Sequence, residues 1–329
     1  MLEEQPVKGK RVLVTGGLGF IGSNLAHRCL ELGARVTIYD CLDPRSGGNM
    51  QNVRDIEPDL EIMLNDMRNF EGVSAAVRKQ DVVFNCAAYT SHPNSMKEPL
   101  VDIDVNCKGV IHLLEAGRRF APEVKIVHVG TSTQIGRMVT RPVDELHPEF
   151  PLDIYSANKT VSEKYILIYG QYYGMRTTVV RLANVYGPRS NIRTPDFGFI
   201  NYFIGLALLG KELTVFGDGS QLRSVSYVED CVDALMRAAM SAASDHQVFF
   251  ASSDRQYSVT ELATAITTCI GGSIRRVEWP KERAALEIGD AVISNAKIKA
   301  ALQWEPRFSL EDGMKRTAAY FKPVLKAYL

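Results

Sequence analysis

The chain has 329 residues, of which 46% are hydrophobic and 23% charged, an ordinary composition for a globular protein of one large or two medium domains. Its 38 basic and 38 acidic residues balance, so there is no general attraction to nucleic acid or to an anionic membrane. No apolar run reaches the length of about 18 residues that spans a bilayer, and the six cysteines lack metal-ligand spacing, so we expect a soluble, cytoplasmic protein without a metal site.

The first 180 residues alternate β-branched runs with helical patterns. Strands are expected at Arg11–Thr15, Arg35–Asp40, Glu61–Asn65, Asp81–Asn85, Lys125–Gly130 and Thr177–Arg181. Helices are expected at Ile21–Leu32, Val73–Lys79, Val101–Arg119 and Ser156–Tyr173. This alternation predicts an α/β protein with a Rossmann-type doubly wound parallel sheet, covered by helices on both faces.

Beyond residue 181 the alternation loosens and turn signals become frequent. Helices are expected at 197–209, 228–243, 259–270 and 310–322, with a strand at 247–251. We therefore expect a smaller, interleaved C-terminal α/β domain for the substrate. The predicted dinucleotide-binding domain comprises residues 1–183 and 228–252, and the predicted substrate domain comprises residues 184–227 and 253–329.

The first strand runs directly into a helix through the sequence GGLGFIG, residues 16–22. In a dinucleotide site the first glycine allows a tight turn, the second lets the backbone approach a pyrophosphate, and the third packs the helix against the strand. The positive end of the helix then faces the phosphates. The candidate cofactor-binding residues in this turn are Gly16, Gly19, Phe20, Ile21 and Gly22.

An aspartate, Asp40, ends the second expected strand. A carboxylate at this position accepts hydrogen bonds from the adenosine ribose and repels a 2′-phosphate, which favours NAD over NADP. The alternative is an ordinary surface aspartate. Arg35 and Arg45 are the nearby arginines that could favour NADP, and neither directly follows Asp40.

Tyr155 and Lys159 stand four residues apart at the start of an expected helix, so they share one face. A phenol is a poor base at neutral pH, and a nearby ammonium would lower its pKa. Ser132, in the hydroxyl-rich sequence at 131–133, could hold and polarise a substrate oxygen, with Thr131 and Thr133 as alternatives.

Taken together, these motifs resemble the extended short-chain dehydrogenase/reductase family, in its NAD-dependent nucleotide-sugar epimerase/dehydratase branch. The resemblance covers nearly the whole chain. Beyond the motifs above it rests on Asp66, Ala87-Ala88, Asn106, Arg181-x-x-Asn184, the Gly217-Asp218-Gly219-x-Gln221-x-Arg223 sequence and the tail at 304–310.

The resemblance implies a role for each matching residue. Asp66 and Met67 are expected at the adenine, Ala87, Ala88 and Asn106 along the cofactor, and Lys159 at the nicotinamide ribose. The expected substrate-binding residues are Ser132, Asn184, Val215, Arg223 and Arg283. Sugar specificity is expected in the segments 89–97, 189–202 and 275–290.

The chain departs from the family pattern in three places. Ile135-Gly136 replaces Val-Tyr-Gly, which leaves the identity of the catalytic hydroxyl open, and Ser224 replaces an aspartate. Related 4,6-dehydratases carry an Asp-Glu pair just after the catalytic threonine, and related decarboxylases carry a glutamate nearby. The matching residues here are Thr133 and Gln134, which cannot act as carboxylate acid and base.

These observations favour an enzyme, an NAD-dependent nucleotide-diphospho-sugar 4-epimerase with Tyr155 as base. The alternatives are a dehydratase, decarboxylase or keto-sugar reductase, for which a glutamate such as Glu145 would have to substitute, and a non-catalytic NAD-binding regulator. A homodimer is expected, because helices 101–119 and 156–173 carry apolar residues on more than one face and family members pair these helices in a four-helix bundle.

Overall fold

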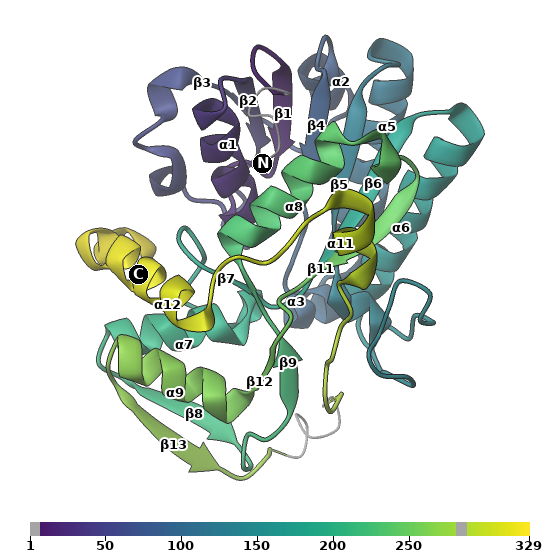
Figure 1. The fold of residues 1–329 in the computed structure, drawn as a ribbon. Coiled ribbons are helices and arrows are strands. Elements are labelled where there is room, and N and C mark those ends of the chain that lie inside the picture. The colour runs from purple at the N-terminus through teal and green to yellow at the C-terminus, as the bar shows by residue number, and fades with distance from the viewer. Residues whose placement is uncertain (1–6, 281–287) are drawn as a thin grey trace.

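A sheet of seven parallel strands forms the centre of the computed structural model, which describes residues 7–280 and 288–329 (Figure 1). The strand order is β11-β6-β5-β4-β1-β2-β3. The strands are β1 (Arg11–Thr15), β2 (Arg35–Asp40), β3 (Leu60–Leu64), β4 (Val82–Asn85), β5 (Lys125–Thr131), β6 (Arg176–Leu182) and β11 (Gln247–Ala251). The predicted Rossmann-type doubly wound sheet is thereby confirmed.

Helices cover both faces of the sheet, as the alternation predicted. They include α1 (Phe20–Glu31), α2 (Phe70–Val77), α5 (Gly109–Phe120), α6 (Ile154–Tyr173) and α8 (Val228–Met240). Successive residues of β1 point to opposite faces: Val12 belongs to the core cluster of α1 and α8, whereas Leu13 belongs to that of α2, α5 and α6. The buried runs of these strands therefore supply two hydrophobic cores.

The expected helix boundaries change where a side chain caps the backbone. Helix α6 begins at Ile154, two residues before the expected start, because the carboxylate of Asp153 accepts a hydrogen bond of 2.8 Å from the Ser156 amide. The single helix expected at 101–119 consists of α4 (Pro99–Ile103), a π turn (Asp104–Lys108) and α5.

A smaller lobe follows the sheet and lies below it in Figure 1. It contains α7 (Phe199–Leu208), β8 (Glu212–Phe216), α9 (Val259–Cys269) and β13 (Ser273–Val277), and β8 pairs in parallel with β13. These two strands were missed because each has only five residues and lies among turn glycines. The domain borders given above stay a prediction, although α8 and β11 return to the main sheet between parts of the lobe.

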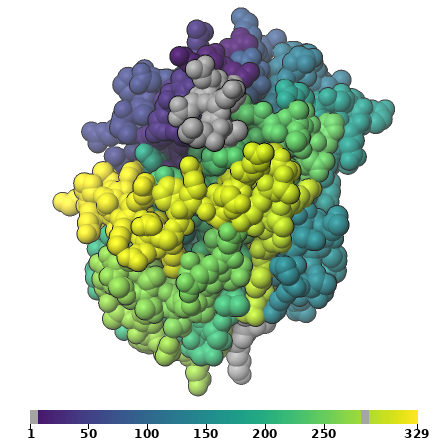
Figure 2. All heavy atoms as spheres, in the orientation of Figure 1, coloured from purple at the N-terminus to yellow at the C-terminus, as the bar shows by residue number. Residues whose placement is uncertain are grey.

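The C-terminal segment runs across the junction between the sheet and the smaller lobe (yellow in Figure 2). It comprises α11 (Ala296–Leu302) and α12 (Leu310–Val324). Between them the buried Trp304 donates a hydrogen bond of 3.0 Å to the Asp230 carbonyl of α8. The amides of Arg307 and Phe308 donate to the carboxylate of the same Asp230. This segment therefore attaches the smaller lobe to α8.

A buried ion pair fixes α6 on the sheet. Arg181 of β6 donates from Nε and Nη2 to the two carboxylate oxygens of Glu163 at 2.8 and 2.7 Å, and both residues are at most 1% exposed. Glu149 also accepts from this guanidinium. Such bidentate pairing of planar groups sets orientation as well as distance.

Candidate active site

A cavity of about 510 Å³ opens where the parallel strands β1, β2, β4 and β5 end. The strand order reverses between β1 and β4, and ligands of open parallel sheets bind at this switch point. The cavity continues to the segment Pro195–Asn201 of the smaller lobe. It therefore lies between the sheet and the lobe.

The glycine turn forms one wall of this cavity at the start of α1. Gly19 caps the helix without a side-chain hydrogen bond, so the first amides of α1 remain available to a ligand. A Cβ atom on Gly22 would lie 2.3 Å from the Gly16 carbonyl oxygen, and one on Gly16 would lie 2.7 Å from the Ala87 amide. The backbone contacts thus require glycine, and the resulting cradle fits a pyrophosphate.

The residues expected at the adenosine line the same cavity. Asp40 accepts hydrogen bonds from the amides of Leu18 and Leu42 at 3.0 and 2.9 Å, which fix its carboxylate at the end of β2. Asp66 and Met67 follow from the end of β3. The Arg68 guanidinium holds the carboxylate of Asp66, and its hydrogen bonds lower the pKa of Asp66.

The potential NADP determinants are engaged elsewhere. The Arg45 guanidinium pairs with Asp43 at 2.8 Å and with Glu98 at 3.2 Å. Arg35 lies at the opposite end of β2 from Asp40. The geometry at the Asp40 end of β2 therefore fits NAD, because the carboxylate can accept hydrogen bonds from the ribose hydroxyls of NAD.

The small residues Ala87 and Ala88 line the cavity, whereas Asn106 does not. Asn106 is buried and holds both backbone polar groups of Tyr89, donating to its carbonyl and accepting from its amide at 2.9 Å each. Its side chain therefore fixes the wall at Tyr89, and its predicted direct contact with the cofactor has no geometric support here.

The hydroxyl beside Tyr155 belongs to Thr131, where Ser132 was preferred from the sequence. Thr131, Thr133 and Tyr155 line the cavity, whereas Ser132 does not, and the Thr131 hydroxyl acts to lower the pKa of Tyr155. The chain leaves β5 at Thr131, and Ser132 begins a 3₁₀ turn that takes it off the cavity wall. Thr133 bonds both Thr131 and Ser156 at 3.1 Å, which extends the hydroxyl chain to the start of α6.

Burial dominates the electrostatics of the Tyr–Lys pair. Burial raises the pKa of Tyr155 above its usual range, and the carboxylates of Asp102 and Asp153 raise it further, against the hydrogen bond from Thr131. Nζ of Lys159 donates to the Val129 carbonyl at 2.8 Å, and burial lowers the pKa of Lys159 to about 8. Burial and the two carboxylates set this direction, and the lowering of the phenol pKa by Lys159 stays a prediction.

Sequence reasoning missed a histidine–aspartate pair at the site. Nδ1 of His92 lies 2.8 Å from Asp153, and the His92 ring packs edge-on against Tyr155 with centroids 4.9 Å apart. His92 lines the cavity from α3 (His92–Lys97). Asp153 could have been found as the cap that precedes α6, but 61 residues separate it from His92, and nothing in the sequence signals that contact.

The expected substrate residues are only partly brought together. Asn184 lines the cavity and donates to the Ser224 carbonyl at 2.8 Å. Val215 is 1% exposed in the core of the smaller lobe, and the Arg223 guanidinium bonds the carbonyls of Leu222 and Gly289, so neither lines the cavity. Arg283 lies outside the described residues. The segments 89–97 and 189–202 do contribute to the cavity wall.

The residues that correspond to the Asp-Glu pair of related dehydratases also change. With Thr131 as the hydroxyl residue, the two positions that follow it are Ser132 and Thr133, and neither can ionise at neutral pH. Gln134 is fully buried and donates to Glu163 at 2.8 Å, so its side chain points away from the cavity. Glu145 accepts from the Phe250 amide and does not line the cavity either.

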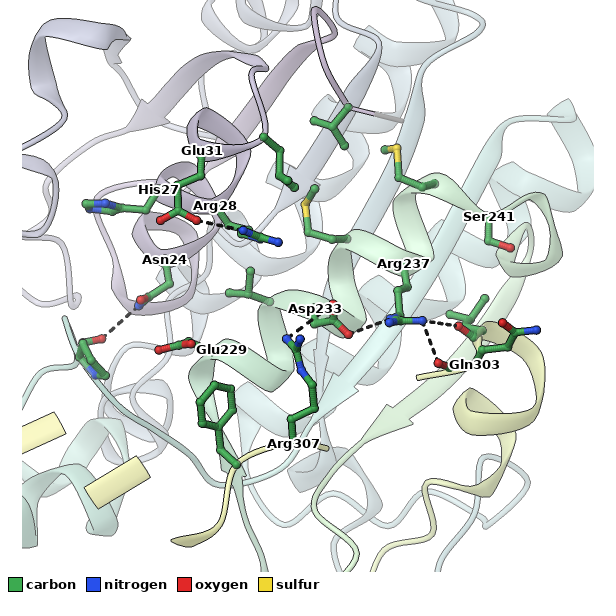
Figure 3. Close-up of a pocket in the computed structure, with 18 of the residues that line it drawn as sticks. Asn24, His27, Arg28, Glu31, Glu229, Asp233, Arg237, Ser241, Gln303 and Arg307 are labelled. Carbon is green, nitrogen blue, oxygen red and sulfur yellow. Dashed lines mark hydrogen bonds and ion pairs between the residues drawn. The ribbon is translucent and has the colours of Figure 1, made fainter. Parts of the chain in front are cut away.

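A second cavity, of about 1070 Å³, lies between α1, α8 and the C-terminal segment (Figure 3). Several of its charges pair with one another: Arg28 with Glu31, and both Arg237 and Arg307 with Asp233. None of the predicted site residues lines it. We therefore assign the chemistry to the smaller cavity, at which the motifs converge.

Two further searches concern the described residues alone. Within them, no helix is both long and apolar enough to cross a membrane. No group of three or more His, Cys, Asp or Glu side chains in residues 7–280 and 288–329 could hold a metal ion.

The sheet order, the glycine turn and the helix with Tyr155 and Lys159 define a dinucleotide-binding protein of the short-chain dehydrogenase/reductase type. Residues 12–258 match the NAD dependent epimerase/dehydratase family, and the chain belongs to that family. The predicted family and the predicted cofactor, NAD, are confirmed.

Relatives with different reactions are similar over almost the full length. The chain is 32% identical to a UDP-glucose 4-epimerase of Mycolicibacterium smegmatis, over 95% of this chain and 98% of the relative. It is also 32% identical to a putative UDP-glucose 4-epimerase of Methanocaldococcus jannaschii, over 94% and 98%. A UDP-N-acetyl-alpha-D-glucosaminuronate decarboxylase of Bacillus cytotoxicus is 31% identical, over 96% and 98%.

Solved structures agree with this assignment. A UDP-glucose 4-epimerase of Thermotoga maritima, solved with UDP-glucose, superposes with a TM-score of 0.86 at 29% identity, over 96% of this chain and 99% of that one. The Thermus thermophilus UDP-glucose 4-epimerase, solved with NAD, has a TM-score of 0.84 at 29% identity, over 95% and 99%.

The glycine turn yields a first prediction. In Gly19→Ala the new Cβ would lie 3.2 Å from the Gly16 carbonyl oxygen, and the φ angle of −80° suits alanine, so the fold should tolerate it. The methyl group would stand where the backbone must approach a pyrophosphate. We expect a loss of NAD affinity of about tenfold or more, or about 1.4 kcal/mol. Calorimetric titration measures it, and unchanged affinity in a normally folded variant would contradict the site.

Proposed function

We propose that the protein is an NAD-dependent nucleotide-diphospho-sugar 4-epimerase. The observation that carries this proposal is the cavity wall formed by Tyr155 and Thr131, without a carboxylate at the two positions after Thr131. The similarity to enzymes named UDP-glucose 4-epimerase supports it. A substrate diphosphate would extend toward Asn184 and the segment 195–201 of the smaller lobe.

In the proposed reaction the side chain of Tyr155 takes the proton from the C4 hydroxyl and later returns it. When bound, NAD would accept the hydride that leaves C4 and give it back later, and its nicotinamide ring would supply a positive charge. The Thr131 hydroxyl holds the C4 oxygen and is itself hydrogen-bonded to Thr133, which in turn is hydrogen-bonded to Ser156. The 4-keto sugar then turns over in the cavity, so that hydride returns to the opposite face of C4.

The alternative reactions place other demands on the residues. A 4,6-dehydratase or decarboxylase would need an acid near the sugar, and the residues after Thr131 do not provide one. A keto-sugar reductase would consume reduced cofactor in proportion to product. The Tyr155–Lys159 pair and its hydroxyl partners argue against a non-catalytic regulator, because they form a complete base-and-orienter set.

The test of this function is proton NMR with a panel of nucleotide-sugars and NAD in deuterated water. We expect an isomeric sugar at equilibrium, without deuterium at C5 and without net NADH. Tyr155→Phe should lower turnover by about 10²- to 10⁴-fold, the usual contribution of a general base, and retain NAD. A 4-keto-6-deoxy product, a pentose product or accumulating NADH would overturn the epimerase proposal, as would full activity of the variant.

The two candidate hydroxyls allow a matched comparison. Thr131→Val keeps the side-chain shape but removes the hydroxyl that lines the cavity with Tyr155, so turnover should fall by about 10²-fold, as for a lost oxyanion donor. Ser132→Ala serves as the control, because Ser132 does not line the cavity, and its steady-state kcat should stay near that of the unmodified protein. The reverse ranking would restore Ser132 as the catalytic hydroxyl.

We propose a homodimer formed through α4 and α6. Val161, Ile168 and Tyr172 are exposed along one stripe of α6, because they recur at intervals of seven and four residues. Leu100 and Ile103 are exposed on α4, which packs beside α6. Large apolar side chains gathered on one face are typical of an interface.

The six cysteines are free, which agrees with the proposed cytoplasmic location.

The proposed interface predicts that one carboxylate introduced into it will dissociate the dimer. Ile168→Glu would bury a carboxylate in the apolar contact, so the dimer should dissociate, as measured by light scattering after size-exclusion chromatography. Leu64→Glu is the matched control, because Leu64 is also more than half exposed but ends β3 at the far edge of the sheet. A monomeric unmodified protein, or a dimeric Ile168→Glu, would contradict the proposal.

A further inference from the structure

His128 lies on β5 behind the cavity, fully buried between Lys159 and Asn85. Its Nε2 atom is 3.0 Å from Nζ of Lys159, and its Nδ1 atom is 2.9 Å from the side-chain amide of Asn85. Asn85 accepts a hydrogen bond of 2.7 Å from the Thr15 hydroxyl. The four buried side chains form one polar chain across β1, β4, β5 and α6, and none of the roles proposed above accounts for it.

The protons in this chain can be counted. Burial, and then the charge of Lys159, keep the pKa of His128 well below its usual range, so the ring is neutral near pH 7. A neutral imidazole carries one N–H and therefore donates from one nitrogen and accepts at the other. It cannot accept hydrogen bonds from both Asn85 and the Lys159 ammonium.

Two arrangements keep His128 hydrogen-bonded to both Asn85 and Lys159. In the first, hydrogen bonds run from Thr15 through Asn85 to His128, and Nε2–H donates to an uncharged Lys159 amine. In the second, a Lys159 ammonium donates to Nε2, Nδ1–H donates to the Asn85 carbonyl, and the Asn85 amide is turned by half a rotation toward Thr15. The second arrangement holds one additional proton, on Lys159, and Lys159 donates to the Val129 carbonyl in both.

We propose that His128 is a positioning residue for Lys159, which it keeps hydrogen-bonded in both protonation states by exchanging tautomers, and that it thereby sets the pH range in which this lysine is charged. The inference rests on the proposed function, in which Tyr155 is the base and charged Lys159, as the family resemblance implies, is its partner at the nicotinamide ribose. The other titratable groups facing Lys159 are Cys86, Cys107, Asp102 and Glu163, which raise its pKa against the larger effect of burial.

The kinetic test replaces the imidazole in the NAD-loaded protein. His128→Phe removes the acceptor of the ammonium, which is the more strongly bonded form, so the charged lysine should be disfavoured. The alkaline limb of the kcat profile should move to lower pH by about one unit, with KM little changed. His128→Gln offers an amide at the position of Nε2 and should move the limb back.

A matched control lies at the opposite end of the sheet. His246 bonds the Met175 carbonyl through Nε2 at 3.0 Å, so His246→Gln tests the loss of a partly buried histidine without touching Lys159. Its pH profile should equal that of the unmodified protein. A His128→Phe protein that binds NAD normally and keeps the unmodified profile would overturn the proposal.

A second measurement needs neither a variant that folds well nor the proposed reaction. In the full-length chain with ¹⁵N-labelled histidine, His128 should stay neutral and change from the Nδ1–H to the Nε2–H tautomer as pH rises through about 8. A tautomer that does not change, or a ring that titrates to imidazolium near pH 6.5, would overturn the link to Lys159. A tautomer change in a protein without epimerase activity would retain the link and reject the proposed function alone.

Discussion

The ion pair between Arg181 on β6 and Glu163 on α6 fixes the helix on which the candidate chemistry depends. Tyr155, Lys159 and Glu163 stand four residues apart, so the pair that anchors Glu163 also orients the face that carries the other two. Both partners are buried, and removing one charge from such a pair typically costs about 3–5 kcal/mol. This interaction therefore sets the position of the tyrosine and the lysine relative to the strand ends.

The cavity presents backbone amides at one end and side-chain hydroxyls at the other. At the α1 end, glycines bring backbone amides to the cavity surface, and the amides of Leu18 and Leu42 hold the Asp40 carboxylate. At the α6 end, the hydroxyls of Thr131, Thr133 and Ser156 are hydrogen-bonded in a row beside Tyr155. The backbone amides at the α1 end suit a part of a ligand that is bound but does not react. The hydroxyls at the α6 end suit proton transfer. The end of β5 connects them, because Thr131 follows directly from a central strand.

The fold itself does not select the reaction. Relatives named epimerase and decarboxylase share about the same identity with this chain over nearly its full length. The difference must reside in a few side chains around the sugar. The candidates here are the non-ionisable residues after Thr131, His92 of α3, whose ring packs against Tyr155, and Asp153, which caps α6 and bonds His92. Burial, and then the carboxylates of Asp102 and Asp153, raise the pKa of Tyr155, so the charges around this phenol decide how readily it gives up its proton.

The sequence by itself determined the strands of the sheet, the glycine turn and the Tyr155–Lys159 spacing, because these depend on local periodicity and on residues adjacent in the chain. Only the tertiary structure decided which hydroxyl faces Tyr155, since a one-residue change in where β5 ends turns Thr131 toward the cavity and Ser132 away. The burial of Val215 and the contact between His128 and Lys159 likewise required distant segments to meet. Packing between elements far apart in sequence sets such contacts, and no local pattern encodes them.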